Sequence, residues 1–407
     1  MQRGSRGAPT GDGSPSAVEI FESRPAVVDL AERDVVEAPS GDRQTGGKET
    51  ADFWQRPFTV REVVLSSVFL VLFCAVLVAS LSHYPYYPCC FHQLSAGIRH
   101  WDFRGLDPSQ PKELWGYSYL SALVAAVTRL PDIYAIVVVS STMFVVANYL
   151  CCRLWGTTVA AWFMVVSWWW LDGATEGMTE PLFMALVLGS FLAFRKGQWV
   201  VAAVLASGAT VVRPTGIFVL GAIGMVLLLR REWRRLAVTF IIGLIVGILY
   251  AIPMKLIYGD ALANVHGYQT HDWSNGFPVT IPLLPEIKGA FMEGGHLRLK
   301  VLITAWVLVT LVGLTKMATD KRFWRYSKIY PVEAIFAGVF AIFLFCYNAP
   351  YWAWLHFPRF VIPLIPFLLL VFLDRLPRDR RIVWTVAGLN IAISVLAKVP
   401  AAHWFAG

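Results

Sequence analysis

Charged side chains are scarce in this sequence. Asp, Glu, Lys and Arg make up 15% of the 407 residues, whereas soluble proteins carry about 25%. Apolar residues account for 57% of the chain and arrive in runs of about 15 to 23, the length that crosses a bilayer core. This pattern excludes a soluble globular enzyme, a nucleic-acid-binding domain and a disulfide-rich secreted module. We attribute the net charge of +8 to the loop charges that set membrane topology.

The usual sequence marks of cofactor chemistry are also missing. The 6 cysteines form no CxxC pair and no Cys/His metal spacing. No HExxH, P-loop or GxSxG occurs, and no GxGxxG lies in a strand-turn-helix context. The sequence therefore supports no cofactor and no metal, although carboxylates alone could still hold a divalent cation.

The first 60 residues differ from the rest of the chain. They are rich in Gly, Ser, Pro and mixed charge, and they lack the apolar h-region of a signal peptide. We interpret residues 1–60 as a disordered cytoplasmic tail and 61–407 as the transmembrane domain. The first apolar run would serve as an uncleaved anchor.

The apolar runs predict an all-α polytopic membrane protein with about eleven transmembrane helices. The expected spans are 63–83, 132–153, 156–171, 179–195, 198–212, 214–230, 235–257, 298–318, 328–347, 357–375 and 381–399. Alternate connections are rich in Lys and Arg, whereas the connections around 172–180 and 348–358 contain neither residue. By the positive-inside rule, this alternation places the N-terminus in the cytoplasm.

Two long connections, about 84–131 and 258–297, then fall on the exoplasmic side. Loops of this length usually have a purpose of their own. The first includes ELWGYSYLSALVAAVTRL, which predicts a helix lying at the membrane surface. A bacterial cytoplasmic membrane fits better than the endoplasmic reticulum, because the sequence has no Asn-x-Ser/Thr acceptor and no retrieval signal.

Several candidate catalytic side chains lie in the first of these loops. Asp102 stands between Trp101 and Phe103, where partial desolvation would suit a general base. In the alternative interpretation, Asp102 simply forms an ion pair with Arg99 or Arg104. The other candidates in this loop are His92, Asp107 and Glu113.

Two arginines and a glutamate are expected at the same membrane boundary. Arg213 precedes a helix-breaking proline in TVVRPTG, and Arg359 follows one in LHFPRFVIPLIPF. A guanidinium there either reaches to the surface or binds a partner such as a phosphate. Glu180 either supports the helix start in TEPLF, with Thr179 as the cap, or lines the acceptor side of a site.

The second loop contains His271 and Asp272, followed by Trp273. This combination has the polarity of a sugar-binding or base site, since aromatic rings stack on the apolar faces of sugars. An ordinary solvated loop would have much the same composition.

Taken together, these motifs resemble the GT-C superfamily of integral-membrane glycosyltransferases over about residues 60–400. The likeness is greatest to PIG-V-like and dolichyl-phosphate-mannose mannosyltransferases. It rests on the large loop after the first span, LWGYSYLSAL, TEPLF, RPTG and PRFVIPLIPFLLL. It implies transfer of a mannose-like hexose from a polyprenyl-phosphate carrier to a hydroxyl of a lipid, glycan or protein acceptor. A loop carboxylate would act as the base in an inverting reaction, and arginines would stabilise the lipid phosphate.

The chain departs from this family where the catalytic acid usually stands, just after the first span. Cys89, Cys90 and His92 occupy that place. Asp102, Asp107 or Glu113 takes the role, or His92 is the base, or catalysis has been lost. In the last case the protein would be a silent GT-C-like binder of a lipid or partner. A lipid transporter or flippase is the further alternative.

Overall fold

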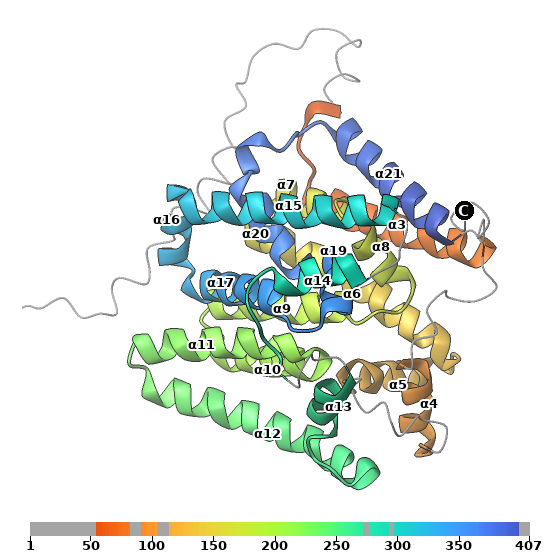
Figure 1. Ribbon diagram of the computed structural model, residues 1–407, viewed down its shortest axis with the longest axis vertical. Helices are drawn as coiled ribbons and strands as arrows, with labels where there is room; N and C mark the ends of the chain where they lie inside the picture. Colours follow the sequence, from red (N-terminus) through yellow and green to blue (C-terminus); the bar gives the residue numbers. More distant parts are fainter. Residues whose placement is uncertain (1–53, 82–90, 104–113, 272–276, 293–296, 399–407) are drawn as a thin grey trace, which may run out of the picture. The chain divides into compact units, whose positions relative to one another are not determined.

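The computed structural model describes residues 54–81, 91–103, 114–271, 277–292 and 297–398. In this part of the chain the regular elements are all helices (Figure 1). One isolated antiparallel bridge joins Val279 to Tyr347. The expected all-α fold class is therefore confirmed, while the proposed tail lies almost wholly outside the described residues.

Within the described residues, four helices are long and apolar enough to cross a membrane. They are α3 (Val60–Leu81), α6 (Asp132–Trp155), α12 (Trp233–Tyr258) and α15 (Leu297–Thr319). The other apolar helices are shorter or interrupted: α7 (Thr157–Val165), α8 (Trp168–Thr175), α9 (Glu180–Arg195), α10 (Trp199–Val212), η2 (Pro214–Gly216), α11 (Ile217–Leu229), α17 (Pro331–Cys346), α19 (Phe357–Phe360), η4 (Ile362–Leu364) and α20 (Ile365–Val371). Helix α21 (Arg380–Lys398) ends the described chain. Helices occupy the described part of every expected span, and the number of crossings stays a prediction.

The expected span 156–171 is not one continuous helix. Ser167 adopts an extended backbone and separates α7 from α8. Nine residues of α-helix are too short for a bilayer core of about 30 Å. Helices α8 and α9 then bend by 105° at the next break, so that the pair forms either one broken span or a re-entrant loop.

The remaining helices lie in the connections. In the two long loops these are α4 (Phe91–His100), α5 (Gly116–Thr128), α13 (Ala263–His271) and α14 (Leu284–Met292). The others are α16 (Lys321–Ile329), α18 (Pro350–Leu355) and η5 (Leu373–Arg375). A helix is thus confirmed in the segment for which we expected a surface helix.

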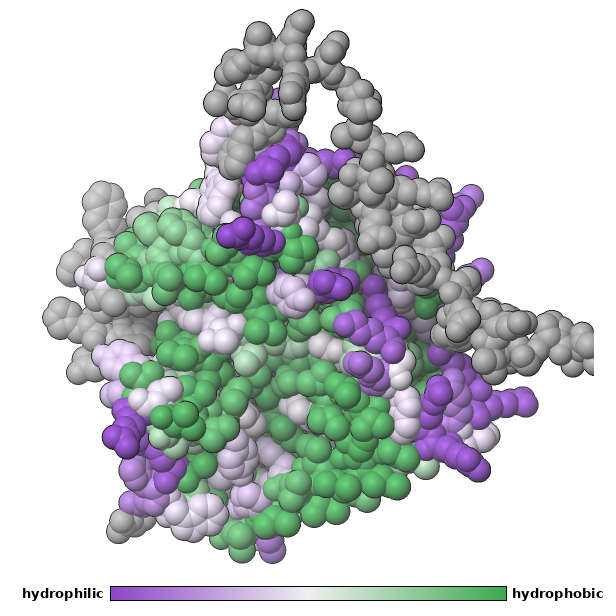
Figure 2. Space-filling model, turned by 180° about the vertical axis from the view of Figure 1, so that it is seen from behind, coloured by the Kyte–Doolittle hydropathy of each residue, from purple (hydrophilic) through white to green (hydrophobic). Residues whose placement is uncertain are grey.

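The surface of the helical region is broadly apolar. Figure 2 shows one face on which a hydrophobic area lies between hydrophilic margins. Helix α12 contributes strongly to this apolar surface, since only 6% of its apolar stretch is buried inside the protein. Its side chains Phe240, Ile245 and Leu249 are exposed. Such a surface would be unstable in water and fits a lipid environment, as expected of a multi-pass membrane protein.

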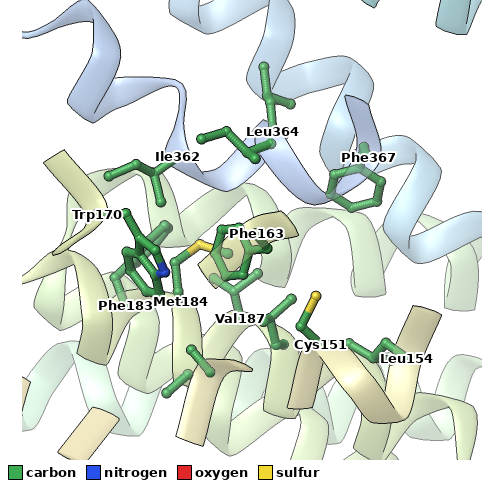
Figure 3. Packing of buried hydrophobic residues seen from close by; sticks show 14 of the residues in the cluster. Cys151, Leu154, Phe163, Trp170, Phe183, Met184, Val187, Ile362, Leu364 and Phe367 are labelled. Carbon is green, nitrogen blue, oxygen red and sulfur yellow. The ribbon is translucent and has the colours of Figure 1, made fainter. Parts of the chain in front are cut away.

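The core lies between α6, α7, α9 and α20 (Figure 3). Phe163 and Trp170 pack with ring centroids 4.8 Å apart, and Phe183 and Phe367 are also fully buried in this core. Aromatic rings bury large areas in this way and contribute strongly to packing. The core therefore holds together the short, broken helices, which could not be stable separately.

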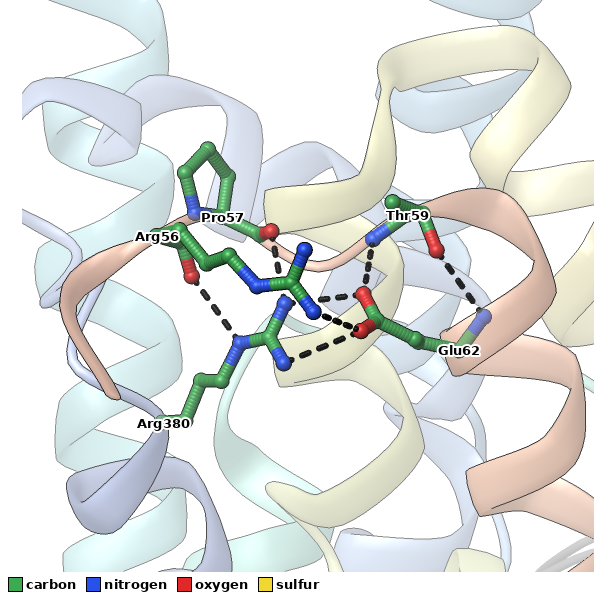
Figure 4. Close-up of polar contacts among 5 residues, drawn as sticks. All are labelled: Arg56, Pro57, Thr59, Glu62 and Arg380. Atoms are coloured by element: carbon green, nitrogen blue, oxygen red, sulfur yellow. Dashed lines mark hydrogen bonds and ion pairs between the residues drawn. The ribbon is translucent and has the colours of Figure 1, made fainter. Parts of the chain in front are cut away.

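Ion pairs fix the end of the bundle at which α3, α17 and α21 begin and α9 ends. We call this the basic end. The guanidinium of Arg380, which starts α21, donates to both carboxylate oxygens of Glu62 in α3 and to the carbonyls of Arg56 and Pro57 (Figure 4). Arg56 and Pro57 belong to the expected tail, and these hydrogen bonds join their backbone to the start of α21.

A second buried network at the basic end joins α9 to α17. Arg195 donates to Glu333 at 2.6 and 2.7 Å and to the hydroxyl of Tyr326 in α16 at 3.1 Å. Tyr326 also accepts a hydrogen bond from Trp155 at 2.7 Å and donates to Glu333. The ends of α6 and α9 and the start of α17 are thereby held together.

Candidate functional site

The opposite end of the bundle, which we call the loop end, carries α4, α5 and α13 (Figure 1), together with α14 and α18 near the end of α17. Helix α5 begins against the last turn of α10, because a β-carbon on Gly116 would lie 2.5 Å from the carbonyl oxygen of Val211. Only glycine allows this approach. Val211 is followed closely by Arg213, so the first long loop is packed beside the expected arginine site.

Glu180, Arg213 and Arg359 form the centre of the site. Arg213 Nη1 and Arg359 Nε both donate to Oε1 of Glu180. The side chain of Glu180 is only 2% exposed, and those of the arginines are 17% and 18% exposed. The sequence predicted all three residues at one boundary but assigned Glu180 to the acceptor side. The structure places it in direct contact with both arginines.

Local sequence explains why these three side chains meet. Glu180 is the first residue of α9 and is followed by Pro181, which suits an early helical position. Arg213 is the extended residue between α10 and Pro214. Thr179, which we expected to cap α9, makes no side-chain capping bond. The carboxylate of Glu180 is thus bound by two arginines that lie outside α9.

Aromatic rings and an imidazole surround the arginines. The Arg213 guanidinium carbon lies 5.8 Å from the ring centroid of Phe183 and 5.6 Å from that of Phe360. His356 is buried, with its ring centroid 5.4 Å from that of Trp169. Burial of the imidazole and the nearby Arg359 guanidinium lower the pKa of His356 to about 3, so His356 is neutral at neutral pH.

The cluster has the charge and the donors to bind an anion. Two guanidinium groups and one carboxylate leave one excess positive charge, since His356 is neutral. Arg213 uses only Nη1 in this pairing, and its Nε and Nη2 make no hydrogen bond with any residue that the structure describes. Guanidinium groups bind phosphate and carboxylate strongly through such paired donors.

An ion pair fixes α4, the helix that leads to Asp102. Asp132, in the first turn of α6, accepts hydrogen bonds from Ser95 at 2.7 Å and Arg99 at 2.5 Å. Asp132 is buried, and Ser118 of α5 donates to the carbonyl oxygen of Phe91 at 3.2 Å. Arg99 therefore pairs with Asp132, so the expected pair of Asp102 with Arg99 is wrong. Arg104, the other expected partner of Asp102, lies outside the described residues.

Asp102 lies just beyond α4 and is exposed. The partial desolvation that we expected from its aromatic neighbours is absent. Phe103 stacks on Trp115 with ring centroids 5.4 Å apart, and Trp101 meets the edge of Phe103 while being 66% exposed. The flanking rings thus pack on each other and leave Asp102 open to solvent.

The other predicted site residues are placed in part. His92, in the first turn of α4, is half-buried. His271 ends α13, and the structure describes its backbone only. Asp107, Glu113 and Asp272 lie outside the described residues. Their suggested roles stay predictions.

Asp172 of α8 and Glu180 of α9, two buried carboxylates near one chain break, bind different partners. Asp172 accepts a hydrogen bond from Ser394 of α21, whereas Glu180 binds the arginines. Across the described residues, no three His, Cys, Asp or Glu side chains lie close enough to hold a metal ion.

Glu286, in the first turn of α14, is a titratable group to which the sequence gave no role. It is 2% exposed, and neither carboxylate oxygen makes a hydrogen bond with a described residue. Burial raises the pKa of Glu286 to about 8. Helix α14 packs closely on α18, since a β-carbon on Gly289 would lie 2.3 Å from the carbonyl oxygen of Pro350. Nothing in the sequence around Glu286 distinguishes it from a solvated loop residue.

Comparisons with known proteins give one structural likeness. No family model matches the chain, and no curated protein does. The structure is similar to that of ArnT from Cupriavidus metallidurans bound to undecaprenyl phosphate, with 16% sequence identity and a TM-score of 0.49. The similarity covers 79% of this chain and 62% of that one. Such values are too low to assign a fold family or a function to this chain.

Proposed function

We propose that this protein is a membrane glycosyltransferase that uses a polyprenyl-phosphate sugar as its donor. The observation that carries the proposal is the pair of arginines that share one oxygen of Glu180 at the loop end. A cation near membrane depth is costly and is retained where it binds something. A lipid phosphate is an anion that reaches this depth, and its sugar would extend towards α4 and α14.

In this proposal the chemistry is an inverting displacement. A carboxylate of the first long loop removes the proton from an acceptor hydroxyl, whose oxygen attacks the anomeric carbon of the donor. The bond to the lipid phosphate breaks, and the Arg213 and Arg359 guanidinium groups stabilise the departing oxygen. Asp102 is the first candidate for the base, with Asp107 and Glu113 as alternates. Its exposure suits an acceptor that arrives from outside the membrane.

The finer assignments follow from the sequence resemblance to the GT-C superfamily. They are a mannose-like hexose, a lipid, glycan or protein acceptor, and a site on the exoplasmic side of a bacterial cytoplasmic membrane with the N-terminus inside. The separation of the structure into a basic end and a loop end agrees with this orientation, because Lys and Arg in the connections set topology.

Transfer from radiolabelled polyprenyl-phosphate hexoses in membranes that contain the protein tests the proposal. We expect Arg213→Gln to lower transfer by about 100-fold or more, as removal of a transition-state donor does. Asp102→Asn should lower it by a similar factor if Asp102 is the base. Arg234→Gln is the matched control, since Arg234 is exposed at the basic end and makes no ion pair with a described residue. Full activity of Arg213→Gln would contradict the proposed phosphate site.

The same assay separates the competing functions. If the well-folded wild-type protein transfers no sugar from any donor but binds polyprenyl phosphate, the silent binder is correct. If it moves the lipid across vesicle membranes without transfer, the protein is a transporter. Full activity of Asp102→Asn would shift the base to Asp107, Glu113 or His92.

A further inference from the structure

Helix α16 differs from its neighbours in carrying strong positive charge. It joins α15 to α17, two apolar helices, and therefore lies where they leave the apolar layer. Asp320 caps it by accepting a hydrogen bond from the backbone N–H of Arg322 at 2.7 Å. The cap fixes the start of α16 and hence which side chains face outward.

Three cations form a stripe along the outer face of α16. Lys321, Arg325 and Lys328 stand at positions i, i+4 and i+7, which share one side of a helix, and all three are exposed. None of them pairs with a carboxylate in the part of the chain that the structure describes. By contrast, Arg322 on the flank of the stripe pairs with Asp374. Like charges at this spacing repel each other, so anions from outside the protein would stabilise the stripe.

An aromatic side chain borders the stripe. Trp324 is 56% exposed, and its indole N–H donates to the carbonyl oxygen of Ala318 at 2.8 Å. A tryptophan held in this way, with its ring outward and its polar atom satisfied, is typical of the boundary between acyl chains and head groups. The outer face of α16 thus combines cations with an interfacial aromatic ring.

The inner face of α16 is tied to the bundle. Tyr326 is buried and takes part in the network of Trp155, Arg195 and Glu333 at the basic end. A force that holds α16 in place therefore also holds the ends of α6, α9 and α17. Helix α16 therefore links an exposed, basic surface to the buried network around Tyr326.

We propose that the Lys321–Arg325–Lys328 stripe of α16 is a binding site for anionic phospholipid head groups, and that their binding stabilises the helix bundle through Tyr326. The phosphates of such lipids supply the missing counter-charge at the depth where α16 lies. Each basic side chain near an anionic surface adds about 1 kcal/mol of attraction, which corresponds to about fivefold in affinity. This site lies at the end opposite the proposed catalytic site and does not depend on the proposed activity.

The test uses the full-length protein in neutral detergent, with its thermal unfolding midpoint followed as lipid is added. Dioleoylphosphatidylglycerol should raise the midpoint by about 2–4 °C, and dioleoylphosphatidylcholine or inorganic phosphate should not. Native mass spectrometry gives the affinity for the same two lipids. The triple variant K321Q/R325Q/K328Q should lose the rise and bind the anionic lipid about 100-fold more weakly.

Three further variants separate charge, position and coupling. K321R/K328R keeps the charge and should behave as the wild type, and R231Q/R234Q removes cations from another connection at the basic end and should also keep the effect. Bound anionic lipid should slow hydrogen exchange in α16 and at the ends of α6 and α9 in the wild type, whereas in Tyr326→Phe, at the same lipid affinity, it should slow exchange in α16 alone. If the triple variant does not fold, Arg325→Gln alone should show about a fivefold loss of affinity. An unchanged rise and affinity in the triple or single variant, or an equal rise with phosphatidylcholine or free phosphate, would overturn the proposal.

Discussion

Arg213 and Arg359 donate to the same oxygen atom, Oε1 of Glu180. The two arginines come from different breaks in the helical chain, one before Pro214 and one after Pro358. A single carboxylate thus brings two cations together that would otherwise repel each other. Oε2 of the same carboxylate is buried and makes no hydrogen bond with any described residue. Glu180 therefore sets both the spacing of the two arginines and the net charge of the proposed anion site.

Replacing Glu180 by Gln should destabilise the protein by about 3 kcal/mol. The change leaves two largely buried guanidinium groups without their counter-charge, which is the costly way to break a buried ion pair. The thermal unfolding midpoint in detergent measures the loss. A polyprenyl phosphate should restore part of it and should raise the midpoint of Glu180→Gln more than that of the wild type. Equal stability of the two proteins would show that the arginines do not need Glu180.

Asp132 provides a test of how α4 is held. In Asp132→Asn the charge-assisted hydrogen bond from Arg99 is lost, and we expect a destabilisation of about 2 kcal/mol that is concentrated in α4. Hydrogen exchange over 91–100, measured by mass spectrometry, should become faster. Asp260→Asn is the control, because Asp260 is an exposed carboxylate of the loop end that pairs with His266 and not with α4. Unchanged exchange in α4 would mean that packing against α5 is sufficient.

Much of the architecture could be predicted from apolar runs and prolines. The runs gave the long helices α3, α6, α12 and α15, because about 20 apolar residues in a row leave few alternatives. Prolines marked the helix breaks at which Arg213 and Arg359 lie. Both signals are local, and hence readable from sequence alone.

The contacts between distant segments could not be predicted in this way. That Arg99 reaches Asp132, and that Glu180 binds both arginines, depends on how helices pack. The break at Ser167 interrupts a run in which that serine is the one strongly polar residue between Val159 and Leu171, so hydropathy gives little sign of it. The exposure of Asp102 likewise follows from the packing of Phe103 on Trp115.

Glu286 should make the stability of the protein depend on pH. Its pKa of about 8 in the folded state lies above the ordinary value of 4.5, so the folded protein keeps a proton that the unfolded chain has already released. Stability should therefore fall as the pH rises from about 4.5 to about 8, by at most about 1.4 kcal/mol per pH unit, and level off above that range.

Glu286→Gln removes this dependence. The neutral amide cannot ionise, so the variant should unfold at a higher temperature than the wild type at pH 8 and at nearly the same temperature at pH 4.5. Thermal unfolding across that pH range is the measurement. Glu232→Gln serves as the control, since Glu232 is a partly exposed residue paired with Arg235, and its profile should follow the wild type. A parallel profile for Glu286→Gln would show that Glu286 is ionised in the folded protein.

The contact between α5 and α10 can be tested by a single methyl group. A β-carbon on Gly116 would lie 2.5 Å from the carbonyl oxygen of Val211, which belongs to backbone and cannot turn away. Gly116→Ala must therefore push α5 from α10, and we expect a destabilisation of about 1–3 kcal/mol, as for other overpacked sites. Sugar transfer should fall as well, because the displacement acts within two residues of Arg213. Gly221→Ala is the matched control: its β-carbon meets nothing within 4 Å, and alanine in a helix should raise stability by up to about 1 kcal/mol. If both variants were equally stable and active, the close approach of α5 to the arginine site would be wrong.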